Sequence, residues 1–300
     1  PLRFDGANVH GATLSVSTWD YDDDGDQDIL VGNDFGEFVL PSQLYANLTS
    51  PGGELEFVEV SQTSGLANFP QFNMGITWSD YDMDGDWDTY LSNMGANSML
   101  ESDGGTFSNV ASTAGVVAGE TPDASQPSGM TMLTSWAAAF WDFDNDFHED
   151  LYVVNGLMPA MMHNAERAPN LLYKNNGDKT FTLVADAKNG AEDTEVGRSL
   201  AVADVNNDGL MDLFVVNLVT PQFGESTDTH RLFLNTGELG AAGQHYLQLR
   251  LRGRESNSEG LGARVAADMG EYTLKRQVVA DPLFQSSSTR VVHFGAAHHR

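Results

Sequence analysis

Residues 20–28 read DYDDDGDQD, a stretch in which six of nine residues are Asp. Related stretches follow at residues 80–88 (DYDMDGDWD), 142–150 (DFDNDFHED) and 204–212 (DVNNDGLMD). The first Asp residues of successive copies are separated by 60, 62 and 62 residues. A fixed period of this length indicates one supersecondary unit that is used repeatedly and stacked on its neighbours.

Strand-like segments surround each acidic stretch at constant positions. An apolar run follows every copy and ends in Asn, 13 residues after the first Asp, at Asn33, Asn93, Asn155 and Asn217. Another apolar run precedes each copy, and further short runs with Gly-containing turns come after it. Four short antiparallel strands in about 60 residues are typical of one blade of a β-propeller. A β-solenoid is the alternative, but its repeats are shorter, and a sandwich would not repeat at one period.

The sequence therefore predicts an all-β protein with two parts. Residues 1–240 are expected to form a β-propeller of four-stranded blades, with repeats near 11–60, 70–115, 130–185 and 195–240. The period ends near residue 240, and residues 241–300 are expected to form a small C-terminal β domain.

The acidic residues have the spacing of a cation-binding loop. When each copy is numbered from its first Asp, oxygen-bearing side chains occupy positions one, three, five and nine. Position seven varies, which fits a backbone carbonyl ligand, because a carbonyl does not depend on the side chain. The candidate ligands are Asp20, Asp22, Asp24, Asp26 and Asp28; Asp80, Asp82, Asp84, Asp86 and Asp88; Asp142, Asp144, Asp146, His148 and Asp150; and Asp204, Asn206, Asp208, Leu210 and Asp212.

Calcium is the cation that suits this pattern. Ca²⁺ takes about 6–8 oxygen ligands, whereas Mg²⁺ keeps several waters and few protein oxygens. Gly stands at position six in three copies and permits a sharp turn, but the third copy has Phe147 there, which is expected to strain the loop or divert it. Ordinary Asp-rich turns are the alternative, although they do not require four oxygens at the same positions in four copies. We expect three to four Ca²⁺ per chain.

The charge of the chain limits its partners. Asp and Glu number 43 against 15 Lys and Arg, a formal net charge of −28. Nucleic acids and anionic membrane surfaces bind basic patches, so neither is an expected partner. No apolar run approaches the ~18 residues of a membrane span, and the absence of Cys excludes disulfides and thiolate metal sites.

The repeats resemble the FG-GAP/VCBS family, the calcium-bearing propeller blades also found in integrin α-subunit heads. The matching features are D-x-D-x-D-G-x-x-D, the apolar strand after it, and an L-Y-x-N segment at residues 44–47 and 172–175, from which the second copy departs at 99–101. The resemblance implies a Ca²⁺ in the loop between the first two strands of a blade. Family propellers commonly close with seven blades, whereas four copies are present here, so the ring is small, subunits complete each other, or the chain is part of a longer protein.

The C-terminal part resembles the ASPIC/UnbV domain. The matching residues are Ser256-Asn257, the segment GLGARV at 260–265, and VHFG at 292–295, after which the family usually continues Leu-Gly where this chain has Ala-Ala.

No nucleophile elbow, H-E-x-x-H motif or P-loop occurs in the sequence. We therefore expect a non-catalytic module that is extracellular or on the cell surface and binds protein or glycan partners on the cell surface or in the matrix. Self-association into an oligomer or filament is a second expectation. A secreted propeller enzyme acting on carbohydrate or small molecules is the alternative, because propellers also carry enzymes.

Overall fold

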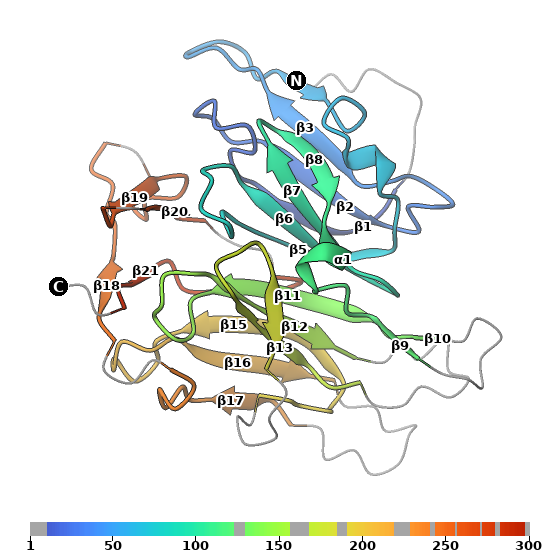
Figure 1. The fold of residues 1–300 in the computed structure, drawn as a ribbon. Coiled ribbons are helices and arrows are strands. Elements are labelled where there is room, and N and C mark those ends of the chain that lie inside the picture. Colours follow the sequence, from blue (N-terminus) through green and yellow to red (C-terminus); the bar gives the residue numbers. More distant parts are fainter. Residues whose placement is uncertain are drawn as a thin grey trace.

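Four antiparallel sheets follow one another along the chain and form neighbouring blades of a β-propeller (Figure 1). The computed structural model describes residues 11–122, 130–156, 168–184, 191–218, 229–240, 244–255, 257–270, 272–279 and 283–297. Strand order within each blade equals chain order, so each blade is a simple meander. The predicted all-β propeller is confirmed.

The strands recur at the expected places in each repeat. Blade one contains β1 (Ala12–Ser17), β2 (Ile29–Asp34), β3 (Gln43–Asn47) and β4 (Phe57–Glu59). Blade two contains β5 (Asn73–Ser79), β6 (Asp88–Asn93), β7 (Ser98–Asp103) and β8 (Thr106–Asn109). Blade three contains β11 (Ser135–Trp141), β12 (Asp150–Asn155), β13 (Leu171–Asn175) and β14 (Phe181–Leu183). Blade four has three strands within the described residues: β15 (Gly197–Ala203), β16 (Asp212–Asn217) and β17 (Arg231–Phe233).

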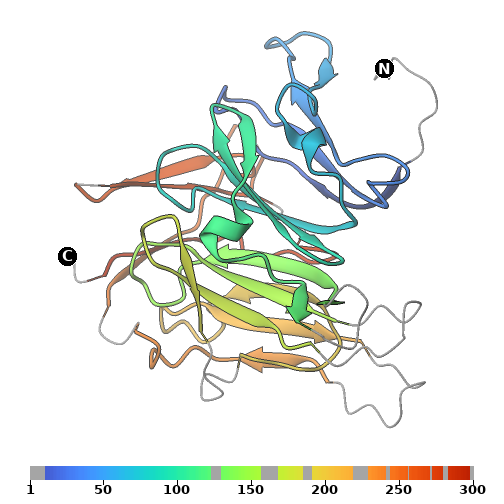
Figure 2. The same cartoon turned by 45° about the vertical axis from the view of Figure 1, so that its right-hand side comes forward.

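The core lies between the blades, because the facing sides of neighbouring sheets pack on each other. Leu30 and Leu44 of blade one pack in one cluster with Ile76 and Leu91 of blade two. Equivalent clusters join blade two to blade three and blade three to blade four. Figures 1 and 2 show the four sheets in this order from the top to the bottom of the molecule. Strand β12 is buried on both faces, and this explains why the residues between Asp150 and Asn155 are apolar without alternation.

Short elements connect the blades. A 3₁₀ turn, η1 (Leu66–Asn68), follows blade one, and one helical turn, α1 (Ala111–Ala114), follows blade two. A two-stranded ribbon of β9 (Glu120–Pro122) and β10 (Met130–Met132) lies before blade three. Within the described ranges, no helix is long and apolar enough to cross a membrane.

The C-terminal part forms two small sheets beside the first strands of the blades, called the inner strands. In the first, β18 (Tyr246–Leu249) pairs with β21 (Val292–Gly295). In the second, β19 (Arg264–Asp268) pairs with β20 (Thr273–Gln277). The segment before β21 runs along β15, where Thr289 N donates to Val202 O at 3.1 Å. These strands confirm the predicted C-terminal β structure, while its resemblance to ASPIC/UnbV stays a prediction; Ser256, one residue of that resemblance, lies outside the described residues.

Candidate metal centres

The four acidic loops, called clusters one (20–28), two (80–88), three (142–150) and four (204–212), connect the first two strands of their blades. All four have the same backbone conformation. Position four has a left-handed φ of 58° to 61°, at Asp23, Met83, Asn145 and Asn207. Position six has a φ of 107°, 100°, 88° and 87°, at Gly25, Gly85, Phe147 and Gly209. Phe147 therefore does not divert the loop but adopts a conformation that favours Gly, so the first of the two expectations, strain, describes cluster three.

Position one closes each loop through its carboxylate. An oxygen of this Asp accepts the N–H of position six at 2.9–3.2 Å in every copy: Gly25 to Asp20, Gly85 to Asp80, Phe147 to Asp142 and Gly209 to Asp204. Position five accepts the N–H of position seven in the same way, as at Asp84, which accepts from Asp86 at 3.0 Å. The repeated acidic residues thus define the turn even before a cation is considered.

Position nine joins the loop to the third strand of its blade in clusters one to three, and to Asn235, just after the third strand, in cluster four. One oxygen of Asp28, Asp88, Asp150 and Asp212 accepts a backbone N–H at 2.8 Å, from Asn47, Ser102, Asn175 and Asn235 respectively. In clusters one, three and four the other oxygen accepts the N–H of position two at 2.9–3.0 Å. Carboxylate oxygens carry two lone pairs each, so these bonds leave room for a ligand role.

Three of the clusters bring carboxylates close enough to share one cation. Their oxygen atoms lie within 4.8 Å of one another in the sets Asp20, Asp22 and Asp28; Asp80, Asp82 and Asp88; and Asp142, Asp144 and Asp146. The side chains of Asp24 and Asp84, predicted as ligands at position five, are exposed. The predicted ligand roles of position seven, at Asp26, Asp86, His148 and Leu210, stay predictions.

Buried carboxylate oxygens in these clusters fit a divalent cation. Asp20, Asp22, Asp80 and Asp144 each bury an oxygen that has no hydrogen-bond partner within the described structure. An unpaired buried charge is costly, and an ion with several oxygen ligands removes that cost. Asp88 of cluster two likewise buries one unpartnered oxygen. The donor set consists of hard oxygens only, which suits Ca²⁺.

The pKa values of the buried Asp residues reflect the same burial. The pKa of Asp80 is raised to about 7, mainly by burial; Asp82 and Asp84 also raise it, and the hydrogen bond from Gly85 N–H lowers it. Burial likewise raises the pKa of Asp142 to about 8, and that of Asp28 to about 7. Without a cation these carboxyl groups take up protons near neutral pH, and a bound cation would keep them ionised.

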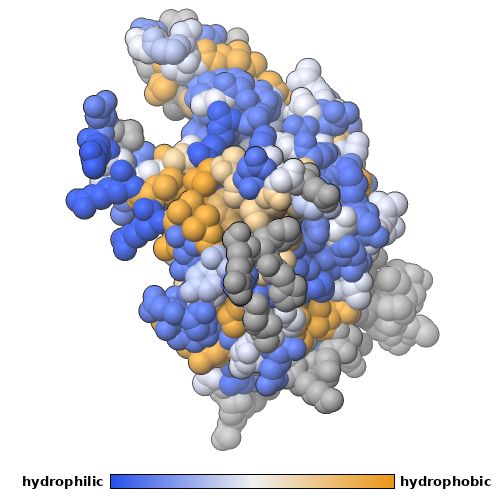
Figure 3. Space-filling view, turned by 60° about the vertical axis from the view of Figure 1, so that its left-hand side comes forward, coloured by the Kyte–Doolittle hydropathy of each residue, from blue (hydrophilic) through white to orange (hydrophobic). Residues whose placement is uncertain are grey.

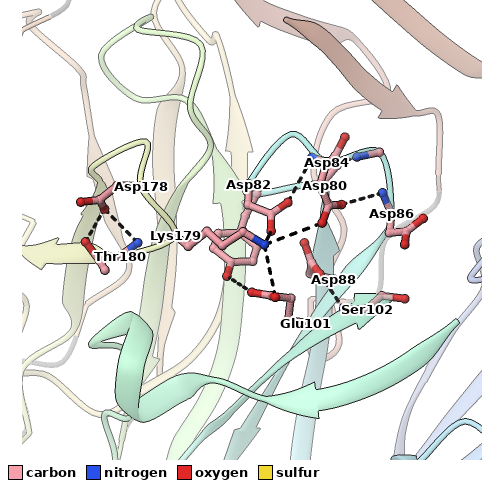
Figure 4. A network of polar contacts seen from close by, with 12 residues as sticks. Asp80, Asp82, Asp84, Asp86, Asp88, Glu101, Ser102, Asp178, Lys179 and Thr180 are labelled. Carbon is pink, nitrogen blue, oxygen red and sulfur yellow. Dashed lines mark hydrogen bonds and ion pairs between the residues drawn. The ribbon is translucent and has the colours of Figure 1, made fainter. Parts of the chain in front are cut away.

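Basic side chains of the chain itself contact each of these three clusters. Lys179, from the β13–β14 turn, lies 2.5 Å from Asp82 and 3.2 Å from Glu101, and Figure 4 shows it pointing between the two. Lys174 pairs with Asp144 and Asp146, and Arg264 pairs with Asp20 and Asp23. Half of the Lys179 side chain is exposed, so it can swing away from Asp82 when a cation binds. These partners lie far from the clusters in sequence, and no sequence signal indicated them.

The turn of the following blade covers each of the first three clusters. A Cβ on Gly105 in the blade-two turn would lie 3.0 Å from the Tyr21 ring and 3.1 Å from Asp22. The blade-three turn brings Lys179 to cluster two, and a Cβ on Gly240 after blade four would lie 3.0 Å from Asp144. Asn side chains add to this cover, because Asn175 donates to Tyr81 O at 2.8 Å and Asn235 donates to Phe143 O at 2.7 Å.

Cluster four differs, since among the described residues no later blade covers it. Asn206 and Asp208 are exposed, and Asn206 Nδ2 donates to Asp208 at 2.8 Å. Burial raises the pKa of Asp204, but hydrogen bonds from Gln248 and from Gly209 outweigh it, so the pKa is lowered overall. Asn206 stands at position three, where the other clusters have Asp, so cluster four has one carboxylate fewer and is not among the three carboxylate sets found in the described ranges. Cluster four therefore has the loop of a metal site with less charge and less burial.

One family comparison agrees with the propeller architecture. Residues 142–215, from cluster three to β16, match the family described as FG-GAP-like repeat. Cartilage acidic protein 1 of Xenopus tropicalis is 35% identical over 83 residues, which are 27% of this chain and 11% of that protein. A lectin of Agrocybe aegerita, whose structure was described for specific recognition of non-reducing terminal N-acetylglucosamine, aligns with 90% of this chain and 68% of its own. That alignment has 14% identity and a TM-score of 0.37.

Proposed function

We propose that this chain is a calcium-stabilised propeller that acts outside the cell as a non-catalytic adhesion or assembly module. The observation that carries the proposal is the set of three convergent carboxylate clusters with buried, unpartnered oxygens. They occupy the same loop in adjacent blades, which is the loop that the FG-GAP/VCBS resemblance assigns to Ca²⁺. Bound calcium would supply positive charge that offsets the repulsion within each cluster.

In this proposal the protein's own residues determine the shape of each site. Positions one and nine are held by backbone N–H groups, and position six allows the chain to turn sharply around the ion position. Asp22, Asp82 and Asp144 at position three complete the three convergent sets. The ion then ties the loop between the first two strands to the end of the third strand.

Two considerations support an extracellular location. Calcium outside the cell would fill even sites of the weakest class, with Kd of about 10⁻⁴–10⁻³ M. The relative that matches part of this chain is named for cartilage and for its acidity, and this chain carries a net charge of −28. A protein or glycan outside the cell is the partner class we propose.

A secreted enzyme is a second candidate, and one cavity favours it. A hollow of about 120 Å³ lies between the inner strands and the C-terminal segment, and Glu149, Arg276 and His293 are among its lining residues. Arg276 Nε lies 3.0 Å from Glu149 and its Nη2 is buried without a partner within the described structure. Loss of turnover with a carbohydrate panel in an Arg276→Met variant would favour the enzyme, provided that the wild-type protein shows turnover.

The proposed function is tested by thermal unfolding in calcium and in EDTA, with bound metal counted on the same sample. We expect a large calcium-dependent rise in Tm and three to four Ca²⁺ per chain. Asp82→Ala should lower Tm in calcium and change it little in EDTA. Asp103→Asn is the matched control, because Asp103 is an exposed carboxylate of the same blade outside the cluster. Equal effects of Asp82→Ala in both buffers would contradict a metal role.

A further inference from the structure

All four acidic loops contact the C-terminal part of the chain, which comprises the described residues from 244 to 297. One polar contact at each loop shows this: Arg264 Nη1 lies 2.9 Å from Asp20, Lys275 Nζ donates to Gly85 O at 2.6 Å, His293 Nε2 lies 2.7 Å from Asn145 Oδ1, and Gln248 Nε2 donates to Asp204 at 3.0 Å. Figure 1 shows β18 to β21 together on one side of the blades. The loops that form the candidate metal centres are therefore also the surface on which this part of the chain lies.

Two of the loops contribute apolar side chains to the core of the C-terminal part. The buried residues of that core are at most 6% exposed: Leu274, Val278, Val292 and Phe294. Met83 of cluster two and Phe147 of cluster three pack against it, although both belong to the propeller. Figure 3 brings this side of the molecule forward, and hydrophobic surface in its middle is surrounded by hydrophilic surface. The loops and the C-terminal part thus share one small core.

Met83 and Phe147 occupy backbone positions that disfavour them. Met83 stands at position four with a φ of 60°, where the other three loops have Asp or Asn. Phe147 stands at position six with a φ of 88°, where the other three loops have Gly. Asn and Gly adopt left-handed conformations more readily than Met or Phe. Such strain persists only where the surrounding structure holds it, and here the C-terminal core packs on both side chains.

Strand β21 approaches cluster three so closely that only Gly fits at its end. A Cβ on Gly295 would lie 2.5 Å from Asn145 Cα and would overlap Asp142 Oδ2. Just beyond the strand, Ala297 N donates to Asn145 O at 2.8 Å. The VHFG segment at residues 292–295 therefore fits against the acidic loop of cluster three: its apolar residues are buried in the C-terminal core, and its His and Gly meet the loop.

The two parts of the chain also differ in charge. Residues 241–300 contain eight Lys and Arg against five Asp and Glu, whereas residues 1–240 contain seven against 38. Arg264 and Lys275 of the C-terminal part both pair with Asp23 of cluster one. The C-terminal part therefore complements the acidic side of the propeller in charge as well as in shape.

We propose that calcium in clusters two and three and the C-terminal part stabilise each other, so that the acidic loops form a calcium-dependent docking surface. This inference rests on calcium binding in the proposed function and gives the C-terminal part a role. A cation would bind the carboxylates of a loop, while the C-terminal part packs on position four or six of the same loop. Both stabilise one strained loop conformation, so each strengthens the other. Cluster one differs, because Arg264 and a cation would compete for Asp20.

Hydrogen exchange of the full chain in calcium and in EDTA tests this inference, at a temperature where the blades stay folded in both buffers. We expect EDTA to speed the exchange of β20 and β21 amides about ten-fold more than that of the inner strands β5 and β11. A factor of this size is within the usual range for coupled sites. An equal change in all four strands, or no change in any, would overturn the inference.

Phe147→Gly separates docking from backbone strain. Gly relieves the strain at position six but removes the contact with the C-terminal core, so β21 amides should exchange about ten-fold faster in calcium. Asn207→Gly is the matched control and should leave β21 unchanged, because Asn207 is a left-handed residue of cluster four that is exposed. Unchanged or slower exchange of β21 in Phe147→Gly would overturn the inference.

A calcium titration provides the reciprocal readout, because coupling acts equally in both directions. Leu274→Ala removes a core side chain of the C-terminal part that lies outside the acidic loops and is 1% exposed. It should lower the calcium affinity of two sites by about ten-fold. Tyr272→Ala, at an exposed position beside β20, is the control and should leave all affinities unchanged. Wild-type calcium affinity in Leu274→Ala would contradict the coupling.

The same samples separate this inference from the proposed function. A Tm that rises with calcium, while β20 and β21 exchange alike in both buffers, would remove the coupling and leave the calcium-stabilised module intact. Absence of bound calcium and of any calcium effect on Tm would instead overturn the proposed function, and the coupling with it.

Discussion

Clusters two and four have the same loop but different surroundings. Both have Gly at position six, left-handed residues at position four, and the same closing bond to position one. Cluster two lies beneath Lys179 and Asn175 of blade three, and its carboxylates converge. Cluster four lies at the end of the described blades, and Asn206 and Asp208 face solvent. The motif therefore specifies the backbone, whereas the burial of the carboxylates differs with the neighbouring blade.

The largest expected difference between the two clusters is their response to pH without calcium. The pKa of Asp80 is raised above its unfolded value, so its proton stabilises the folded state at low pH. In EDTA, stability should therefore fall as pH rises from about 5 through 7, and calcium should abolish that fall. Urea unfolding across this pH range measures it.

Cluster four should show the opposite sign. The pKa of Asp204 is lowered, so it contributes stability above its unfolded pKa, and this stability is lost only as pH falls through the folded value. Asp80→Asn should make the decline in EDTA less steep, because Asp28 and Asp142 with their raised pKa values still contribute to it, whereas Asp204→Asn should leave it unchanged. A decline between pH 5 and 8 as steep in Asp80→Asn as in the wild type would contradict this assignment.

Removing one charge from each cluster should destabilise the calcium-bound protein more at cluster two than at cluster four. Asp80→Asn keeps an acceptor for the Gly85 N–H but weakens calcium binding, which contributes about 2.7 kcal/mol when calcium is about 100 times its Kd. We expect a loss of about 2–3 kcal/mol in calcium for Asp80→Asn and under about 1 kcal/mol for Asp204→Asn in dilute protein. Denaturant unfolding in calcium measures both. Equal losses at the two clusters would show that burial by the next blade does not set affinity.

Substitution of the turn glycine should destabilise the protein more at cluster four than at cluster two. A Cβ at Gly85, with φ 100°, costs about 1–2 kcal/mol through backbone strain. Gly209→Ala should cost more, because its Cβ would lie 1.8 Å from the Tyr246 ring, which must move. Both losses should be similar in calcium and in EDTA, since the strain does not depend on the ion. A neutral Gly85→Ala in chemical denaturation would refute the assigned strain.

The smallest effect concerns the cover over cluster two. Asn175→Ser removes the hydrogen bonds to Tyr81 O and Glu149 O and should destabilise the protein by about 1 kcal/mol. Asn176→Ser, in the exposed neighbouring turn, is the matched control and should change stability by under about 0.5 kcal/mol. If the calcium affinity of cluster two is unchanged in Asn175→Ser, this side chain covers the cluster without affecting its affinity for calcium.

The repeat period predicted most of the fold. Asp20, Asp80, Asp142 and Asp204 mark the loop after the first strand of each blade. The strand after the cluster ends at the predicted Asn in blades two to four and one residue later, at Asp34, in blade one. The left-handed residue at position four was missed, because Met83 at that position conceals a preference that Asp or Asn would indicate. The backbone conformation at Phe147 could not be predicted from the sequence, since a strained turn and a different loop path are both compatible with the loss of Gly.

The third cluster was predicted to differ from the others because Phe147 replaces Gly, whereas the structure sets cluster four apart. Three clusters bring three carboxylates together, and cluster four has Asn206 at position three and is more exposed. Lys179 approaches Asp82 from 97 positions further along the chain, and Arg264 approaches Asp20 from 244 positions away. Contacts across such separations depend on how blades pack, and no local pattern reports them.

The cover of each cluster by the next blade also makes the molecule directional. Energies in stacked repeats are dominated by nearest-neighbour terms, and here one such term includes the cover of one repeat's acidic cluster by the next repeat. During synthesis, cluster one can reach its final form only after blade two has been made, and cluster two only after blade three has followed. The proposed calcium sites would therefore be completed in chain order, from cluster one to cluster three.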